Sequence, residues 1–302
     1  MKQNCCIIYN PTTASFNPKE LDKSAHVLAE KYDVIMRRSE YKSHVVDLVQ
    51  ELNEETDLII TYGGDGTFSE AVKSILSVGQ KAILSHIPAG TTNDLKRNFK
   101  LSANPQESAR LIVNGEEQQI DIFRVNNNPF SYVAAFGFLA NAPCNTPAEL
   151  KKYLGHLSYL VTGFKEFLDK PPVYNINCVT ENGEYQLDCI TGIITNAIGF
   201  GGMKLFKDVN INDEYAELTL IKPIDKKEML HIARDIILKR FNIKNYPEQA
   251  IHVKAKSAKI TFADNIPEDY FDLDGEKVDV LGGNQELSLE PSQKLQLILP
   301  KR

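Results

Sequence analysis

Two adjacent stretches decide the fold: DLIITYGGDGTFSEAVKSILSV at residues 57–78 and AILSHIPAGTTND at residues 82–94. Each begins with an apolar run that stops at glycine or proline, which is typical of a strand buried on both faces of a parallel sheet. Between the two strands, apolar residues at 68, 71, 72, 75 and 76 recur with helical spacing. The sequence therefore predicts a strand–helix–strand unit with a glycine-rich turn at Gly63–Thr67.

The alternation continues outward to about residue 122. Strands are expected at 4–9 and 32–37, and helices at 18–31 and 43–54. Strands that alternate with helices form a parallel sheet covered on both faces. Residues 1–122 are therefore predicted to be a three-layer α/β domain.

After residue 122 the chain changes to short β-rich runs separated by turn residues, a pattern typical of a β-sandwich. Residues 123–285 are therefore predicted to be a second domain. Runs at 130–136 and 184–194 are each expected to form one strand, and helices are expected at 147–169 and 226–240. A last strand at 295–299 is expected to return to the first domain, which would then include residues 286–302.

Composition narrows the functional classes. The chain has 302 residues and a net charge of −6, which argues against general nucleic-acid binding. Its five cysteines are odd in number and lack a C-x-x-C pair, so we expect free thiols in a reducing cytoplasm. No run approaches the roughly 18 apolar residues of a membrane span. Six histidines show no metal-binding spacing, and His86 is expected to be a packed, hydrogen-bonded imidazole.

Polar and glycine-rich loops follow all four expected strands of the first domain, at Asn10–Thr13, Ser39, Gly63–Thr67 and Pro88–Asp94. The carboxyl ends of parallel strands share one sheet edge, where open α/β sheets bind ligands. At Gly63–Thr67, glycines allow close backbone approach and the next helix offers N–H groups to an anion, so phosphate is the expected guest. Asp65 would then help to hold Mg²⁺. The alternative is an ordinary glycine-rich turn with Asp65 near a helix cap.

These two motifs carry a family resemblance. Gly63–Thr67 with Glu70, followed by IPAGTTNDL at 87–95, resembles the catalytic domain of diacylglycerol kinases, which sphingosine, ceramide and soluble bacterial lipid kinases share. The likeness continues in the family's order through Ile120-Asp121, Phe136–Phe138, Asn196, Gly201-Gly202, Asn210, Asp213 and Asp274–Glu276. It implies an α/β domain of the NAD-kinase and diacylglycerol-kinase type with a β-sandwich, and ATP-dependent phosphorylation of a lipid hydroxyl, with diacylglycerol as the leading candidate.

The resemblance also implies roles for individual residues. Asp274 and Glu276 would be the catalytic pair, and the active site would lie in a cleft between the domains. A structural magnesium would be held by Asp213 and by carbonyls of Asn210 and Tyr215, while Asp65 and Asp94 would join a water-linked magnesium network. ATP would be bound within the set Asn10, Pro11, Thr12, Thr13, Ala14, Ser39, Gly63, Gly64, Asp65, Gly66, Thr67, Phe68, Ser69, Glu70, Thr91, Asn93 and Asp94.

Three features keep alternatives open. The family's first loop reads Asn-Pro-x-Ser-Gly, whereas Asn10–Ala14 has no glycine. The magnesium strand usually carries Asp-Asp-Gly, whereas this chain has Asp213–Tyr215. Asp274-Gly275 between two β-rich runs is also a preferred hairpin turn. An NAD kinase-like or other small-molecule kinase, or a non-catalytic lipid- or nucleotide-sensing homologue, therefore remain alternatives.

A lipid substrate implies transient peripheral contact with a membrane. Because the net charge is negative, a local basic cluster is needed, and Lys96, Arg97 and Lys100 are the expected one. Lys222, Lys226 and Lys227 are expected to be a solvated face. The expected location is cytoplasmic, at the inner membrane surface, and a homodimer is left open.

Overall fold

A computed structural model describes residues 2–13, 15–138, 140, 171–263 and 271–301. The chain forms two compact units, one of residues 1–120 with 293–302 and the other of residues 121–292. Each unit has its own hydrophobic core and is described separately below. The helix expected at 147–169 lies outside the described residues.

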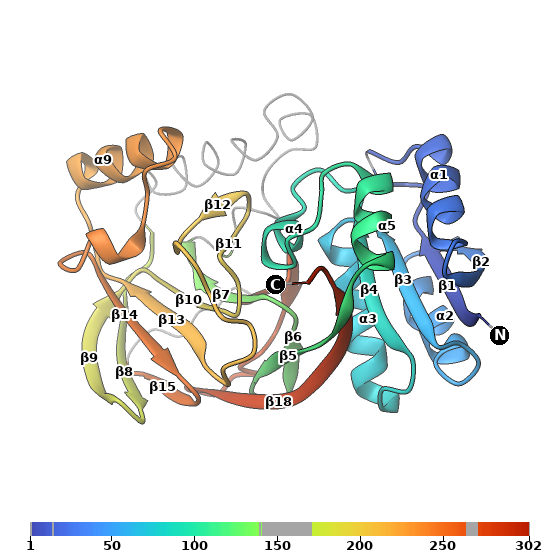
Figure 1. The fold of residues 1–302 in the computed structure, drawn as a ribbon. Helices are drawn as coiled ribbons and strands as arrows, with labels where there is room; N and C mark the ends of the chain where they lie inside the picture. The colour runs from blue at the N-terminus through green and yellow to red at the C-terminus, as the bar shows by residue number, and fades with distance from the viewer. Residues whose placement is uncertain (1, 14, 139, 141–170, 264–270, 302) are drawn as a thin grey trace. The chain divides into compact units, whose positions relative to one another are not determined.

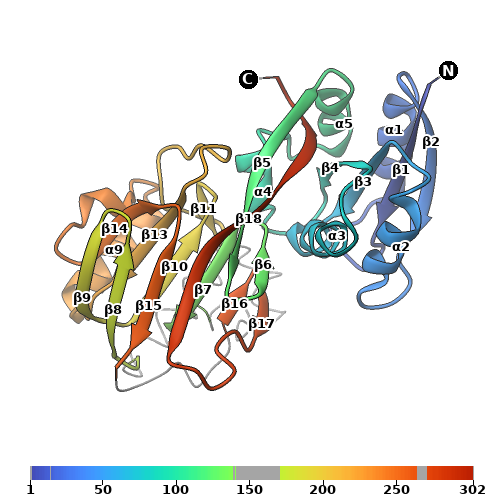
Figure 2. The same cartoon turned by 90° about the horizontal axis from the view of Figure 1, so that it is seen from below.

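The first unit is a three-layer α/β structure. Its parallel sheet has the order β2-β1-β3-β4, and Figure 2 shows this sheet between α1 and α5 on one side and α2 and α3 on the other. The elements are β1 (Gln3–Tyr9), α1 (Pro18–Leu28), β2 (Tyr32–Arg38), α2 (His44–Leu52), β3 (Leu58–Gly63), α3 (Asp65–Val78), β4 (Ile83–Pro88), α4 (Asp94–Asn98) and α5 (Pro105–Val113).

Helix boundaries in this unit follow local chemistry. Asn17 and Asn104 cap α1 and α5 by accepting backbone N–H bonds, and each is followed by proline at the first helical position. The sheet strand β3 is buried along its whole length, as a central parallel strand requires. The predicted three-layer domain is thus confirmed.

The second unit is a β-sandwich. One sheet is antiparallel with the order β14-β13-β10-β7-β16-β17, and β15, β8 and β9 pair in the other (Figure 1). Its elements are β6 (Asn128–Phe130), β7 (Val133–Gly137), β8 (Tyr174–Thr180), β9 (Gly183–Cys189), β10 (Thr191–Thr195), β11 (Gly199–Phe200), β12 (Met203–Lys204), β13 (Ala216–Ile221), α9 (Lys226–Ile237), η1 (Ile243–Asn245), β14 (Ala250–Ala255), β15 (Ala258–Phe262), β16 (Phe271–Leu273) and β17 (Glu276–Val278).

Two long strands run from one unit into the other, β5 (Glu116–Val125) and β18 (Glu286–Leu299). β18 pairs with β15 through residues 286–289 and with β4 at Leu297–Leu84. The strand expected at 295–299 is the end of β18, which is 14 residues long instead of five. Pro291 lies in its middle, between the segments that pair with β15 and β4, so its missing N–H interrupts neither of those ladders.

Aromatic side chains fill the core of the sandwich. The Phe136 ring lies 5.2 Å from that of Phe262, 5.6 Å from Phe271 and 6.0 Å from Tyr174, measured between centroids. Phe136 and Phe271 come from one sheet and Tyr174 and Phe262 from the other. Tilted and edge-to-face aromatic contacts of this kind add to the hydrophobic stabilisation of packing the two sheets together.

Two predicted strands are each divided in the structure. The run 130–136 becomes β6 and β7, because the N–H groups of Ser131 and Tyr132 donate to the Asp274 carboxylate instead of a neighbouring strand. The run 184–194 becomes β9 and β10, which belong to different sheets. None of the helices in the described ranges combines the length and the apolar character needed to cross a bilayer.

Candidate active site

The carboxyl ends of the first unit's strands meet at one edge of the sheet. Tyr9 pairs with both Arg38 and Tyr62, and Gly63 pairs with Pro88. Beyond these pairs, the Ser39 N–H donates to the Tyr9 carbonyl at 2.9 Å and the Ala89 N–H to the Gly63 carbonyl at 2.7 Å. The four loops singled out in the sequence therefore begin side by side.

The first loop is closed by the side chain of Asn10. Its amide oxygen accepts the Thr12 N–H at 2.9 Å and the Thr12 hydroxyl at 2.7 Å, and its carbonyl accepts the Thr13 N–H. This is the Asx-turn arrangement, which bends the chain without a glycine. Pro11 and Thr13 are half-buried and Thr12 is exposed, while Ala14 lies outside the described residues. The Asn10 side chain thus makes the turn in this loop, which has no glycine.

The two glycine loops touch each other. A Cβ added at Gly90 would lie 2.6 Å from the Gly64 Cα, closer than real Cβ atoms come. A Cβ added at Gly66, in contrast, would meet no atom of another described part of the chain within 4 Å, leaving aside its chain neighbours and its own helix backbone. Gly90 is therefore required by the packing of the two loops, whereas the space beside Gly66 is open.

Asp65 ties the same loops together by hydrogen bonds. Its carboxylate oxygens accept the Asp94 N–H at 2.8 Å and the Leu95 N–H at 3.1 Å, so Asp65 caps α4 while standing in the first turn of α3. Asp94 is buried and accepts a bond of 2.8 Å from Arg97. The two acids expected near magnesium are thus brought together. Each also makes hydrogen bonds within the protein, Asp65 to the start of α4 and Asp94 to Arg97.

The second glycine loop is held by Asn93. This residue has φ of 51°, a left-handed conformation that Asn tolerates, and its side chain bonds both the N–H and the carbonyl of Gly90. Thr91 is exposed at the tip of the loop. These bonds fix the loop in the absence of a ligand, which lowers the entropy cost of binding one.

The remaining predicted residues of α3 divide between site and core. Gly64 is the N-cap and has no side chain with which to cap the first N–H groups of the helix. The Thr67, Phe68 and Ser69 side chains are buried, and Phe68 packs its ring against His86 and Phe99. Glu70 is half-buried. The Phe68 side chain therefore anchors α3 to the hydrophobic core, and only the backbone of Phe68 can face a ligand.

His86 is buried beneath these loops. Its Nδ1 lies 2.8 Å from the Thr61 hydroxyl, while its Nε2 has no partner within the described residues. Burial lowers the pKa of His86 to about 3, although the hydrogen bond with Thr61 opposes that shift. The expectation of a packed imidazole is confirmed, with a hydrogen bond at one nitrogen only.

Asp274 and Glu276 stand at the ends of a tight hairpin. Leu273 pairs with Glu276, and the two loop residues Asp274 and Gly275 have φ of 57° and 90°. Two positive φ values in a two-residue loop are the signature of a type I′ turn. The hairpin interpretation of Asp274-Gly275 is therefore correct for the backbone, and any catalytic role is added to it.

The two carboxylates have different surroundings. Asp274 is 4% exposed, and its oxygens accept four bonds of 2.7–3.1 Å, from the Ser131 N–H and hydroxyl and from the N–H groups of Tyr132 and Val133. Glu276 is exposed at the start of β17. The Asp274 carboxylate therefore binds groups of residues 131–133, whereas the Glu276 side chain is exposed to solvent.

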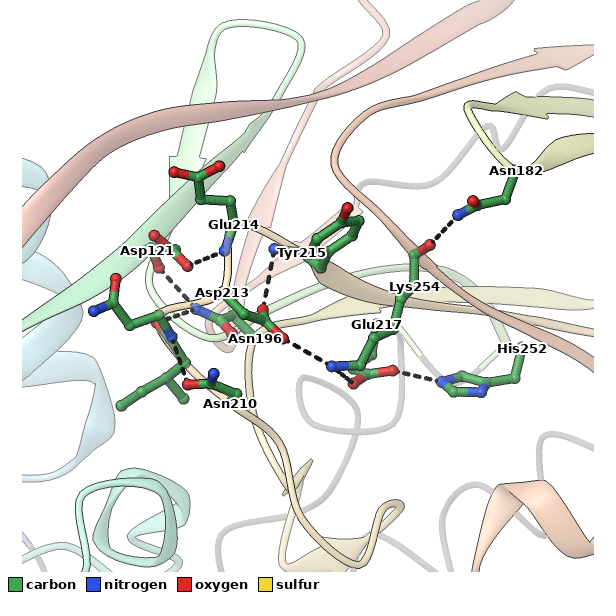
Figure 3. Close-up of polar contacts among 12 residues, drawn as sticks. Asp121, Asn182, Asn196, Asn210, Asp213, Glu214, Tyr215, Glu217, His252 and Lys254 are labelled. Carbon is green, nitrogen blue, oxygen red and sulfur yellow. Dashed lines mark hydrogen bonds and ion pairs between the residues drawn. The ribbon is translucent and has the colours of Figure 1, made fainter. Parts of the chain in front are cut away.

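The residues expected around a structural magnesium are brought together but are engaged otherwise (Figure 3). The Asp213 carboxylate receives the Lys254 ammonium at 2.9 Å and the Tyr215 N–H at 3.2 Å. The Asn210 side chain accepts the Asn212 N–H. A positive charge from the protein itself therefore lies against the carboxylate that the resemblance assigned to the metal. The magnesium site at Asn210, Asp213 and Tyr215 stays a prediction.

Lys254 is part of a larger charge cluster. Its ammonium also lies 3.4 Å from Glu217, which is 3% exposed, and the other Glu217 oxygen lies 2.7 Å from His252 Nε2. Partial burial opposes the charge on Lys254, but the bonds and charges of Asp213 and Glu217 outweigh it and raise the pKa of Lys254. Glu217 and Lys254 are cross-strand partners in β13 and β14, a pairing that depends on the sheet register and that the sequence alone did not reveal.

Known proteins resemble this chain over most of its length. Residues 4–125 match the family model described as the diacylglycerol kinase catalytic domain. Curated proteins named diacylglycerol kinase from Staphylococcus epidermidis RP62A and Staphylococcus carnosus TM300 are 29% and 27% identical, and each alignment covers 100% of this chain and 93% and 96% of the relative.

Solved structures extend the likeness to the whole fold. A crystal structure of a diacylglycerol kinase from Bacillus anthracis str. Sterne superposes with a TM-score of 0.75 at 20% identity, covering 98% of this chain and 97% of the other. A second structure from the same organism gives a TM-score of 0.80 at 22% identity with the same coverage. Together with the paired glycine loops, these matches show that residues 4–125 are similar to the diacylglycerol kinase catalytic domain and that the whole chain has the fold of the two solved structures.

Proposed function

We propose that this chain is an ATP-dependent lipid kinase that phosphorylates the free hydroxyl of diacylglycerol and releases phosphatidic acid and ADP. The observation that carries the proposal is the contact between the two glycine loops, which Asp65 holds together through the N–H groups of Asp94 and Leu95. A rigid loop pair with open space beside Gly66 suits a polyphosphate that must be oriented closely. Curated relatives named diacylglycerol kinase supply the lipid class.

In this proposal the first unit binds ATP. The start of α3 faces the phosphates with its N–H groups and positive dipole end, while Asn10, Ser39 and Thr91 line the adjoining loops. Magnesium bound with the nucleotide would be held through water by Asp65 and Asp94 and would offset charge on the phosphates.

The second unit supplies the acid–base pair in this proposal. Glu276 accepts the proton of the lipid hydroxyl as its oxygen attacks the γ-phosphorus, the bond to the ADP oxygen breaks, and the proton leaves on Glu276. Asp274 is a positioning residue, because its four bonds fix the turn from which Glu276 projects. We further propose that the enzyme works in lipid metabolism at the cytoplasmic face of the membrane.

Phosphoryl transfer from labelled ATP tests the proposal. The acceptor panel contains diacylglycerol, monoacylglycerol, ceramide, sphingosine, phosphatidylglycerol and NAD, each with and without Mg²⁺. We expect label in phosphatidic acid above all other products. Label in NADP would instead identify an NAD kinase, and absence of any labelled product with intact ATP binding would support a sensing protein.

A further inference from the structure

Helix α9 carries the largest exposed apolar side chains of the described second unit. Leu230, Ile237 and Leu238 are 56%, 59% and 49% exposed, although Met229 on the same helix is buried. Leu230 and Ile237 lie seven positions apart and therefore share one face of the helix. A packed sandwich does not need these side chains to face outward, so this face, defined here as the α9 face, fits contact with something outside the described chain.

Cations surround the same apolar residues. Lys227 and Arg234, also seven positions apart, flank Leu230 and Ile237, while Lys226, Lys239 and Arg240 are exposed at the helix ends. Within the described parts of the chain, Lys226, Lys227, Lys239 and Arg240 form no ion pair. The sequence interpretation of Lys226 and Lys227 as a merely solvated face left out these apolar neighbours.

The two acidic residues between 226 and 240 bind groups of the protein itself. Glu228 closes the capping box with Asp225 and accepts a bond from Gln249 at 2.9 Å. Asp235 accepts the Tyr246 hydroxyl at 2.8 Å and is paired with Arg234. Residues 226–240 hold five Lys or Arg and two Asp or Glu, a balance of +3 on a chain of −6. The α9 face is therefore positively charged, although the net charge of the whole chain is negative.

We infer that the α9 face docks on an anionic lipid bilayer, lying in the plane of the interface with its leucine and isoleucine side chains among the acyl chains. Apolar residues flanked by lysine and arginine on one helix are the pattern of interfacial helices. This inference rests on the proposed lipid substrate, which the enzyme has to reach in a membrane.

The basic cluster expected from the sequence fits this role less well. Arg97 is engaged by the buried Asp94 at 2.8 Å, and the apolar neighbours Phe99 and Leu101 are buried. That cluster offers charge without exposed apolar side chains, whereas the α9 face offers both.

Tryptophan fluorescence tests the inference directly, because the chain contains no tryptophan. Leu230→Trp places one reporter on the α9 face, and Ile35→Trp places a matched reporter on β2, where Ile35 is 51% exposed. We expect vesicles of phosphatidylcholine and phosphatidylglycerol to shift Leu230→Trp emission to the blue and to leave Ile35→Trp unchanged. No shift for Leu230→Trp, or equal shifts for both reporters, would overturn the inference.

Co-sedimentation with the same vesicles gives a second measurement. The variant L230S/I237S/L238S is expected to bind at least tenfold more weakly, and K226Q/K227Q/K239Q/R240Q to lose the salt-sensitive part of binding. The control I35S/M36S should bind as the wild type does. Wild-type binding by the triple serine variant would refute the inference, as would loss of self-association without loss of vesicle binding, because the face would then belong to a second copy.

Activity on a dispersed short-chain diacylglycerol separates this inference from the proposed function. All folded variants should phosphorylate it at the wild-type rate, with folding checked by circular dichroism. If the wild type binds anionic vesicles through α9 but phosphorylates no lipid, the proposed function fails while the docking surface stands. If it phosphorylates the dispersed lipid but the α9 variants bind vesicles normally, only the docking surface fails.

Discussion

Asp274 and Glu276 are two positions apart, yet only one of them is accessible. Asp274 accepts four hydrogen bonds. In Asp274→Asn the amide NH₂ would face the N–H groups that now donate to the carboxylate, and some of these buried N–H groups would be left without an acceptor. Asp274→Asn should therefore lose both stability, by about 1–3 kcal/mol, and activity. Urea unfolding and initial rates measure the two effects.

Glu276→Gln should behave differently. The exposed side chain contributes little to stability, but a lost general base lowers kcat by roughly 10²–10⁴-fold. The expected result is an unchanged urea midpoint with nearly abolished turnover. Near wild-type kcat for Glu276→Gln would show that the base lies elsewhere.

Gly66 and Gly90 separate ligand contact from packing. Gly66 lies within α3, and a Cβ there would clash with none of the described residues, so Gly66→Ala should raise the unfolding free energy by about 0.5–1 kcal/mol. If ATP lies in that space, the same variant should weaken ATP binding, measured by calorimetry. Gly90→Ala, which clashes with Gly64, should destabilise by roughly 1–3 kcal/mol. A stabilised Gly66→Ala with unchanged ATP affinity would place the phosphates away from this turn.

Among the elements, β13 and β14 are joined by the charge cluster at Lys254. Lys254→Met removes the cation beside the buried Glu217 and the half-buried Asp213 and should cost about 1–2 kcal/mol. The cost is less than for a fully buried pair because Lys254 is 43% exposed. Lys256→Met is the matched control, since its pair with Glu214 is exposed to solvent and contributes little to stability.

The same cluster predicts a response to metal removal. Because the Lys254 ammonium occupies Asp213, chelation with EDTA should leave the melting temperature of the nucleotide-free protein unchanged. A fall in melting temperature that Mg²⁺ reverses would show a divalent cation at this position after all.

The sequence predicted elements where one local pattern dominates. The β3–α3–β4 unit was placed to within two residues because its apolar runs, helical spacing and glycines agree. The division of 130–136 could not be predicted, because the break is caused by Asp274, more than 130 residues further along the chain. The ion pair between Asp213 and Lys254 could not be predicted for the same reason, because the two residues lie 41 positions apart and meet only in the folded β domain.

For the whole molecule, buried His86 predicts a pH dependence. Its folded pKa of about 3 lies below its ordinary value of 6.5, so the unfolded chain takes up a proton that the folded chain excludes. His86 therefore reduces stability as pH falls from 6.5 toward 3, by about 1.4 kcal/mol per unit. His86→Gln should flatten the plot of unfolding free energy against pH in this window, and identical slopes for the two proteins would contradict the assignment.

Strand β18 also has a consequence for synthesis. Its residues 293–299 belong to the first unit, but they follow every strand of the second unit in the chain. During translation the four parallel strands are synthesised early, and the edge of β4 that pairs with β18 stays unpaired until the second unit has been synthesised. An open edge of this kind can pair with a second nascent chain. The ribosome-bound intermediate is thus the form most exposed to aggregation and most in need of a chaperone.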